Sequence, residues 1–258
     1  MTTLSSLRDV WESLAKRDAL HAILTDTTKV GGRWNIEEFM ATGAAEVEML
    51  MQHLAGLGYV PDRGGSALDF GCGVGRLTQA LGRHFNTCVG VDISETMVQQ
   101  AQLFNKLPHC RYIATSDIPL PFPAEAFSFI YSNIVLQHIP RRFAKEYLRE
   151  FVRVLSADGM LVFNAQDSFA MPDLKSFLIR FRHVLHLRSR IKVILRIGSG
   201  DMQMHCLPEG VVREMLGSAN ILDVQFTNTA AKDFNGRMAY LQRAPRSGYV
   251  SKQYCVMK

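Results

Sequence analysis

The feature that most constrains this chain is the stretch ALDFGCGVGRLT, Ala67 to Thr78, which predicts a strand, a tight turn and a helix start. Its apolar run suits a strand buried in a parallel sheet. Gly71, Gly73 and Gly75 lack a Cβ atom, so the turn can adopt positive φ angles and let a ligand lie against the backbone. The free N–H groups at the helix start favour anions. The stretch therefore predicts an α/β fold with a ligand site at the carboxyl ends of parallel strands.

The spacing of the glycines distinguishes this turn from a dinucleotide-binding loop. That fingerprint is G-x-G-x-x-G, and its third glycine would fall on Arg76. Asp69 precedes the first glycine, and a second buried-strand pattern, VGVD, ends at Asp92 about twenty residues later. A carboxylate at that strand end can accept hydrogen bonds from both hydroxyls of a ribose.

These motifs resemble those of the class I S-adenosylmethionine-dependent methyltransferases over about residues 67–164. The resemblance implies a Rossmann-like, doubly wound, seven-stranded and mostly parallel sheet, with S-adenosyl-L-methionine as the cofactor. It also implies a set of cofactor-binding residues around the glycine turn and after the second, third and fourth strands. These are Asp69, Gly71, Cys72, Gly73, Gly75, Asp92, Ile93, Met97, Ser116, Asp117, Ile118, Ser132 and Asn133.

The acidic members of this set also have structural interpretations, which the sequence leaves open. Asp69 can cap backbone N–H groups at the strand end, and Asp92 can act as a helix N-cap. Asp117 can be the side chain of an Asx turn. Cys72 is a small residue that fits within the turn.

Helical and strand patterns alternate along the chain and predict one domain over residues 1–258. Residues 1–60 are expected to form a helical cover, 61–166 the cofactor-binding core, 167–207 a helical cap insertion and 208–258 the rest of the sheet. The crossover helix is expected at 77–85 and the fifth strand at 160–164. The last strand is expected at 249–257, with 238–241 as its competitor. Trp34, Phe39 and Thr42 are interpreted either as closing the pocket or as core residues.

Charge and cysteine patterns narrow the class of protein. The net charge is +5, but residues 174–197 contain seven Lys or Arg and no acid, so the basic character is local and does not indicate general nucleic-acid binding. An anionic or membrane-associated acceptor would fit a basic lid there. The five cysteines lack C-x-x-C pairing, and His183 and His186 lack an evident third ligand, so no metal site is predicted. Without a signal or membrane-spanning pattern, a cytoplasmic protein is expected.

Two residues after sheet strands are the candidates for catalysis. His138 follows the fourth strand and Asp167 the fifth, so their side chains are expected to converge beside the methyl group, with Asp167 orienting His138 or acting as the base. His138 can instead be a residue hydrogen-bonded near the helix start at Pro140, and Asp167 a loop cap. His205 is a weaker third candidate.

The segment Ser132-Asn133-Ile134-Val135 also bears on the acceptor. It lacks the Pro-Pro-aromatic pattern of DNA amino-methylating relatives, and neither a Pro-Cys nucleophile nor paired glutamates are found. We therefore predict a small-molecule acceptor, with oxygen favoured because a histidine base suits a hydroxyl, and with nitrogen or carbon open. The rivals are an RNA-directed enzyme using residues 175–196 and a non-catalytic module that keeps the cofactor fold. The sequence does not define the oligomeric state.

Overall fold

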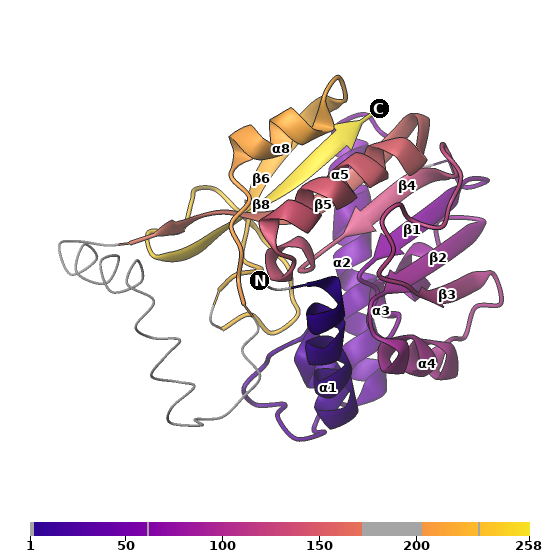
Figure 1. Ribbon diagram of the computed structural model, residues 1–258, viewed down its shortest axis with the longest axis vertical. Coiled ribbons are helices and arrows are strands. Elements are labelled where there is room, and N and C mark those ends of the chain that lie inside the picture. The colour runs from indigo at the N-terminus through magenta and orange to yellow at the C-terminus, as the bar shows by residue number, and fades with distance from the viewer. Residues whose placement is uncertain (1–2, 61, 172–202, 232) are drawn as a thin grey trace.

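A computed structural model describes residues 3–60, 62–171, 203–231 and 233–258 of the chain. Its elements follow one another in the alternating order that the sequence predicts (Figure 1). They are α1 Leu4–Ile23, α2 Ile36–Gly56, β1 Ser66–Phe70, α3 Arg76–Leu81, β2 Thr87–Asp92, α4 Glu95–Phe104, β3 Cys110–Ala114, β4 Phe127–Ser132, the 3₁₀ turn η1 Leu136–His138, α5 Arg141–Val154, β5 Leu155–Ala170, α8 Glu209–Leu216, β6 Asn220–Thr227, β7 Tyr240–Leu241 and β8 Gly248–Met257.

The strands form one sheet in the order β3-β2-β1-β4-β5-β8-β6-β7. The pairs from β3 to β5 are parallel, and β8 enters antiparallel between β5 and β6. The predicted doubly wound α/β fold is confirmed, but the sheet has eight strands where seven were expected. The difference arises because both candidates for the last strand form: β8 occupies the favoured position, and the two-residue β7 pairs antiparallel with β6 at the edge.

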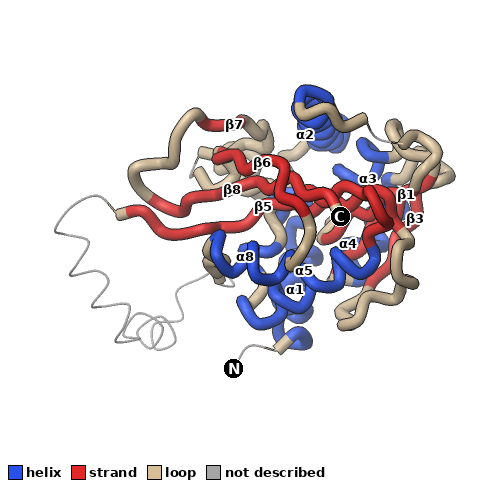
Figure 2. The backbone as a smooth tube through the Cα atoms, turned by 90° about the horizontal axis from the view of Figure 1, so that it is seen from above, coloured by secondary structure: helices blue, strands red, loops and turns tan. Residues whose placement is uncertain are grey.

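Helices cover both faces of the sheet, so each face has its own apolar core. On one face, α2, α3 and α4 pack on side chains such as Phe129 and Val162. On the other, α5 and α8 pack on Ile130 and Phe163. Figure 2 shows α2 and α3 on one side of the red strands, and α5 and α8 on the other. A third cluster joins α1 to Trp34, Phe39 and Phe234.

Local signals explain where several elements begin. The Ser94 side chain accepts from the Met97 N–H and starts α4, as predicted. Pro140 precedes the first residue of α5, where a missing N–H costs no helical hydrogen bond. The crossover helix is shorter than predicted, because α3 ends at Leu81 and residues 82–85 form a turn. α1 contains a kink at Asp18, whose carboxylate accepts from the Gly31 and Gly32 N–H groups.

The fifth strand is longer than predicted and changes the start of the expected cap. β5 continues to Ala170 because it pairs with β8 beyond Asn164, so Asp167 lies within the strand and not in a loop after it. Residues 203–207 return along the sheet, where the Leu207 N–H donates to the Gln166 carbonyl at 2.7 Å. The predicted basic lid at 175–196, with His183 and His186, lies outside the described residues. None of the described helices is long and apolar enough to cross a bilayer.

Candidate functional site

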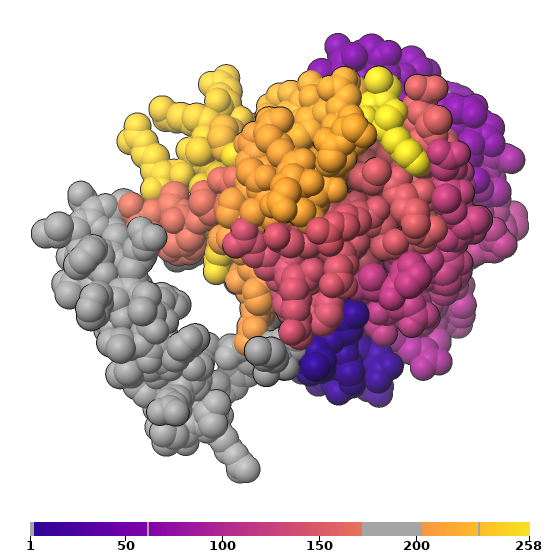
Figure 3. Space-filling view, turned by 45° about the horizontal axis from the view of Figure 1, so that its top comes forward, coloured from indigo at the N-terminus to yellow at the C-terminus, as the bar shows by residue number. Residues whose placement is uncertain are grey.

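A cavity of about 330 Å³ lies where β1, β2 and β4 end, beneath α1. Ligand pockets typically begin at about this volume. The glycine turn and the ends of β2 and β4 provide one part of its wall, and Leu4, Leu7 and Trp11 of α1 provide another. The indigo atoms of α1 are at one edge of the molecule in Figure 3. The N-terminal helix thus forms part of the wall of the cavity at the carboxyl ends of these strands.

The glycine turn has the backbone that its sequence predicts. Gly71, Gly73 and Gly75 have φ angles of 80°, 51° and 83°. A Cβ on Gly71 would lie 2.2 Å from a methyl of Val135, and one on Gly73 would lie 2.5 Å from Ile23. Gly71 and Gly73 line the cavity with Cys72 between them, whereas Gly75 forms the N-cap of α3 and faces Tyr112. Glycine is thus needed at these positions for both conformation and space.

Asp92 lines the cavity and holds the turn at the same time. Its Oδ2 accepts from the Gly73 N–H at 2.8 Å and its Oδ1 from the Ser94 N–H at 2.9 Å. Burial raises the pKa of Asp92, while these hydrogen bonds act against the rise. Each carboxylate oxygen has a second lone pair, so Asp92 retains the capacity to accept from a ribose diol. The binding and structural interpretations are therefore compatible.

Asp69 lies behind the glycine turn and does not line the cavity. It is buried, and Thr78 of α3 donates to its Oδ2 at 2.6 Å. Burial raises the pKa of Asp69 to about 7, although the Thr78 hydrogen bond and Arg76 lower it. The contacts of Asp69 tie the end of β1 to α3.

The cofactor-binding region expected after the third strand is lined differently from the prediction. Ile93 and Met97 line the cavity, as does Thr115 after β3. Ser116, Asp117 and Ile118 are not among the lining residues. Asp117 is exposed, and its backbone N–H donates to Thr115 Oγ1 at 3.0 Å. The sequence motif therefore predicts the wrong residue here: Asp117 does not line the cavity, whereas Thr115, which belongs to no distinctive motif, does.

After β4, a buried polar network meets the cavity. Asn133 lines the cavity and donates from Nδ2 to Glu46 Oε1 at 2.6 Å, and Tyr131 donates to the same oxygen at 2.8 Å. Arg76, another lining residue, pairs with Glu46 at 2.9 Å. The preceding residue, Ser132, is fully buried and donates to the Phe70 carbonyl, which joins β4 to β1.

On the cavity-lining residues of this network, two buried polar atoms have no hydrogen-bond partner within the described part of the chain: Asn133 Oδ1 and Arg76 Nε. Both belong to residues that line the cavity. Unpaired buried polar groups are costly, so these atoms indicate a ligand with its own donor and acceptor groups. The amino and carboxylate groups of a methionine moiety have those properties, and the residues therefore fit S-adenosylmethionine. The role of Glu46 is not predicted from the sequence, because this residue lies in an otherwise ordinary helical pattern.

His138 also lines the cavity, within η1. Its imidazole is buried and lies edge-on to Trp11, with ring centroids 5.4 Å apart. Nε2 is 3.1 Å from the Gln137 side-chain nitrogen, while Nδ1 has no hydrogen-bond partner among the described residues. Burial lowers the pKa of His138 to about 4, against the effect of the Gln203 backbone. The ring is therefore neutral at physiological pH.

Asp167 does not lie beside His138 in the structure. Its Oδ1 accepts from the Glu209 N–H at 2.9 Å and is 3.1 Å from the Lys252 ammonium. Burial tends to raise the pKa of Asp167, but these partners hold it below its usual value. Asp167 caps the start of α8 and does not line the cavity, and neither does His205. The prediction that Asp167 lies just past the fifth strand is wrong, because β5 extends beyond this residue.

The candidates for pocket closure from the second helix region pack elsewhere. Trp34 and Phe39 contact each other edge-on with ring centroids 5.5 Å apart, within the cluster below α1. Thr42 accepts from Arg76 at 3.3 Å. None of the three lines the cavity, so their role is packing and support.

Comparisons with known proteins match the central part of this chain to methyltransferases. Residues 68–163 match the methyltransferase domain family. Over 127 residues the chain is 28% identical to the uncharacterized methyltransferase YcgJ of Bacillus subtilis, covering 47% of this chain and 49% of that protein. Over 110 residues it is 28% identical to the malonyl-(acyl-carrier protein) O-methyltransferase of Salmonella typhimurium, covering 43% and 42%. The matched stretches thus span about half or less of these relatives.

The whole fold is shared with a crystal structure of magnesium protoporphyrin IX methyltransferase from Synechocystis PCC 6803 with bound S-adenosylmethionine. The TM-score is 0.60 at 17% identity, over 100% of this chain and 98% of that one. Its complex with S-adenosylhomocysteine gives a TM-score of 0.59 at 18% identity, over 99% of this chain and 100% of that one. Residues 68–163 thus match a methyltransferase domain, and the chain has the fold of these S-adenosylmethionine-binding methyltransferase structures.

Proposed function

We propose that this protein transfers the methyl group of S-adenosylmethionine to a small-molecule acceptor, with a hydroxyl oxygen favoured. The observation that carries the proposal is one cavity that is lined both by Asp92, Gly73 and Asn133 and by the buried imidazole of His138. When bound there, S-adenosylmethionine supplies a methyl group activated by a sulfonium. The chain's own residues then need to align the acceptor, exclude water and take a proton.

His138 is proposed to take the acceptor proton at Nδ1. Gln166 Nε2 contacts Gln137 Oε1, and Gln137 in turn contacts His138 Nε2, so the two amides connect the ring to β5. The two ends of an amide are nearly isosteric, and the chain can run in either direction. When the Gln137 oxygen accepts from Nε2–H, Nδ1 carries a free lone pair. The amides would thereby select the tautomer in which His138 acts as a base.

The apolar part of the cavity supports a small acceptor with a substantial apolar body. Leu7, Trp11, Tyr147 and Phe234 are among its lining residues. Such a wall excludes water from a developing charge and favours apolar surface by about 25 cal/mol per Å² buried. The Salmonella relative, an O-methyltransferase by name, is in keeping with an oxygen acceptor.

The test uses S-adenosylmethionine with a labelled methyl group, the purified full chain and a cellular extract. We expect label in the small-molecule fraction, on an oxygen when the product is analysed by NMR. Label that is lost with ribonuclease treatment would favour the RNA-directed alternative. Binding of S-adenosylhomocysteine without transfer to any fraction would favour a non-catalytic module.

A further inference from the structure

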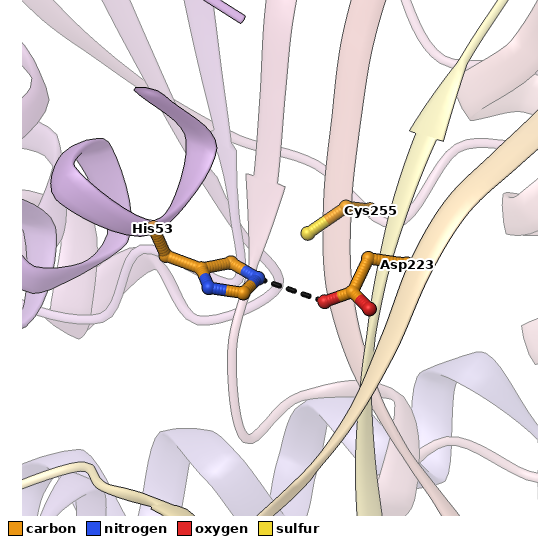
Figure 4. Close-up of side chains that lie close together, drawn as sticks. All are labelled: His53, Asp223 and Cys255. Carbon is orange, nitrogen blue, oxygen red and sulfur yellow. Dashed lines mark hydrogen bonds and ion pairs between the residues drawn. The ribbon is translucent and has the colours of Figure 1, made fainter. Parts of the chain in front are cut away.

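A second cluster of chemically reactive side chains lies away from the cavity. His53 of α2, Asp223 of β6 and Cys255 of β8 come together on the sheet face covered by α2 (Figure 4). One ligating atom from each residue lies within 4.8 Å of the other two, and His53 Nε2 is 2.8 Å from Asp223 Oδ2. None of the three lines the cavity. We propose that these three side chains form a binding site for a zinc-like divalent cation.

The local fold brings the two strand residues onto the same face. β6 and β8 are antiparallel, and their register shifts between Ile221 and Asp223, which places Asp223 opposite Cys255. Such a bulge re-aims a side chain at a chosen point of a strand. Without the shift, Leu222 would stand opposite Cys255. The bulge thus brings a carboxylate beside the thiol, and α2 supplies the imidazole from above.

The donor set matches the preferences of zinc. Zinc takes cysteine sulfur at about 2.3 Å, and histidine nitrogen and carboxylate oxygen at about 2.0 to 2.2 Å, in tetrahedral geometry. Ligand atoms around such an ion are separated by roughly 3 to 4 Å, a spacing that small side-chain rotations can produce from the present cluster. A thiolate and a carboxylate would neutralise the dication, which suits a half-buried position. Solvent would supply the fourth ligand.

The surroundings are compatible with cation entry and ligand orientation. The His53 and Asp223 side chains are each 19% exposed, whereas Cys255 is buried. Asp223 Oδ1 accepts from Gln225 at 3.2 Å, and the Tyr240 ring lies against His53 at 4.6 Å. Hydrogen bonds and packing of this kind orient metal ligands. Binding would form a metal–sulfur bond and release the Cys255 thiol proton to water.

The position of the cluster suggests what the cation would do. His53 lies about two helical turns from Glu46 on α2, close to the same helix face. Glu46 pairs with Arg76 at the wall of the cavity. A cation held by His53, Asp223 and Cys255 would therefore link α2 to the antiparallel end of the sheet. Because α2 also carries Glu46, this link would stabilise a helix that supports the cofactor site. No local sequence pattern indicates this cluster, because its three residues come from elements far apart in the chain.

The test is a titration of the chelator-treated full chain with Co²⁺, followed by displacement with Zn²⁺. We expect one equivalent of Co²⁺ to bind with a thiolate-to-metal charge-transfer absorption, and Zn²⁺ to remove that absorption. Cys255→Ala should abolish the band, whereas Cys206→Ala, at a partly buried cysteine outside the cluster, should retain it. Absence of the band in the wild type, or its persistence in Cys255→Ala, would overturn the proposal.

A second measurement guards against a variant that fails to fold. His53→Ala and the near-isosteric Asp223→Asn should each weaken Zn²⁺ binding by at least about tenfold, and the zinc-dependent rise in melting temperature should shrink accordingly. Circular dichroism would report folding without metal. Wild-type zinc affinity in folded Asp223→Asn and His53→Ala would show that the cluster is a His–Asp ion pair beside a buried cysteine.

Discussion

Individual residues near the cavity have two kinds of role. Some side chains line the cavity, where they can contact a ligand, and others hold the backbone around it. Asp92 does both, since it lines the cavity and accepts from Gly73 and Ser94. Asp69 and Ser132 do not line the cavity; Asp69 instead accepts from Thr78, and Ser132 donates to the Phe70 carbonyl. Acids at equivalent strand ends thus have different roles, because one carboxylate faces the cavity and the other faces α3.

We expect Asp92→Ala to weaken binding of S-adenosylhomocysteine by roughly ten- to a hundredfold, or about 1.5 to 3 kcal/mol, because a charged hydrogen-bond acceptor is lost. Isothermal titration calorimetry would measure the affinity. Asp117→Ala is the matched control, since Asp117 is exposed and outside the lining. If the two substitutions exchanged their effects, the cofactor-binding interpretation of Asp117 would stand and the one for Asp92 would fall.

His138→Ala should lower kcat by two to four orders of magnitude, about 3 to 5 kcal/mol, with little change in cofactor affinity. Asp167→Asn should leave kcat near wild type, because Asp167 contacts Lys252 and Glu209 outside the cavity. Turnover would be followed by label transfer to the identified acceptor. Wild-type turnover in His138→Ala would show that alignment suffices and that water or another group takes the proton.

The pH profile offers an independent check on His138. Burial lowers its pKa to about 4, so the neutral form that accepts a proton predominates above that pH. We expect the protonation of His138 to leave kcat unchanged from about pH 8 down to about pH 5, and to lower kcat at pH values below about 5. A fall centred near the usual histidine pKa of about 6.5 would contradict the buried environment described for this ring.

At the scale of elements, α1 is held over the cavity by one carboxylate. Glu12 accepts from Ser94 Oγ at 2.7 Å, from the Thr96 N–H at 3.2 Å and from the Thr96 hydroxyl. These groups form the N-terminal turn of α4, where a negative charge is favourable. Burial tends to raise the pKa of Glu12, but the hydrogen bonds from Thr96 and Ser94 lower it to about 2. The contact therefore persists throughout the physiological pH range.

We expect Glu12→Gln to loosen α1 and to reduce unfolding free energy by about 1 kcal/mol, as for the loss of a charge-assisted cap. Hydrogen exchange in residues 4–17 should become faster. Because the folded pKa lies below the unfolded value of 4.5, the wild-type stabilisation is present above about pH 4.5 and is lost as pH falls toward 2. Asp9→Asn, on an exposed face of α1, is the control. Unchanged exchange in Glu12→Gln would mean that apolar packing alone holds the helix.

At the scale of the whole molecule, one buried ion pair joins the cover, the glycine motif and the sheet. Glu46 of α2 meets Arg76 of α3, and both side chains are at most 4% exposed. Tyr131 and Asn133 attach the same carboxylate to β4. Gly43, one turn earlier on α2, leaves room for Arg76, because a Cβ there would lie 2.5 Å from the Arg76 carbonyl oxygen.

Glu46→Gln should lower unfolding free energy by about 3 to 5 kcal/mol, because it leaves a buried guanidinium without its counter-charge. The double variant Glu46→Gln/Arg76→Met should recover part of that loss, since it also removes the stranded charge. Urea unfolding followed by circular dichroism would measure both. If the single variant were as stable as the wild type, solvent would have to reach this ion pair, and the burial described for it would be contradicted.

The class of fold and the cofactor motif can be predicted from the amino-acid sequence, because both follow from local rules. Three glycines at fixed spacing require positive φ angles, buried strands read as apolar runs, and Ser94 and Pro140 mark helix starts within a few residues. The partners of side chains far apart in sequence depend instead on how the elements pack. In the folded chain Asp167 lies within β5, Glu46 pairs with Arg76, and His53 lies beside Asp223 and Cys255. These outcomes depend on strand length, on a bulge in β6 and on how α2 packs across the sheet, and no local pattern specifies any of them.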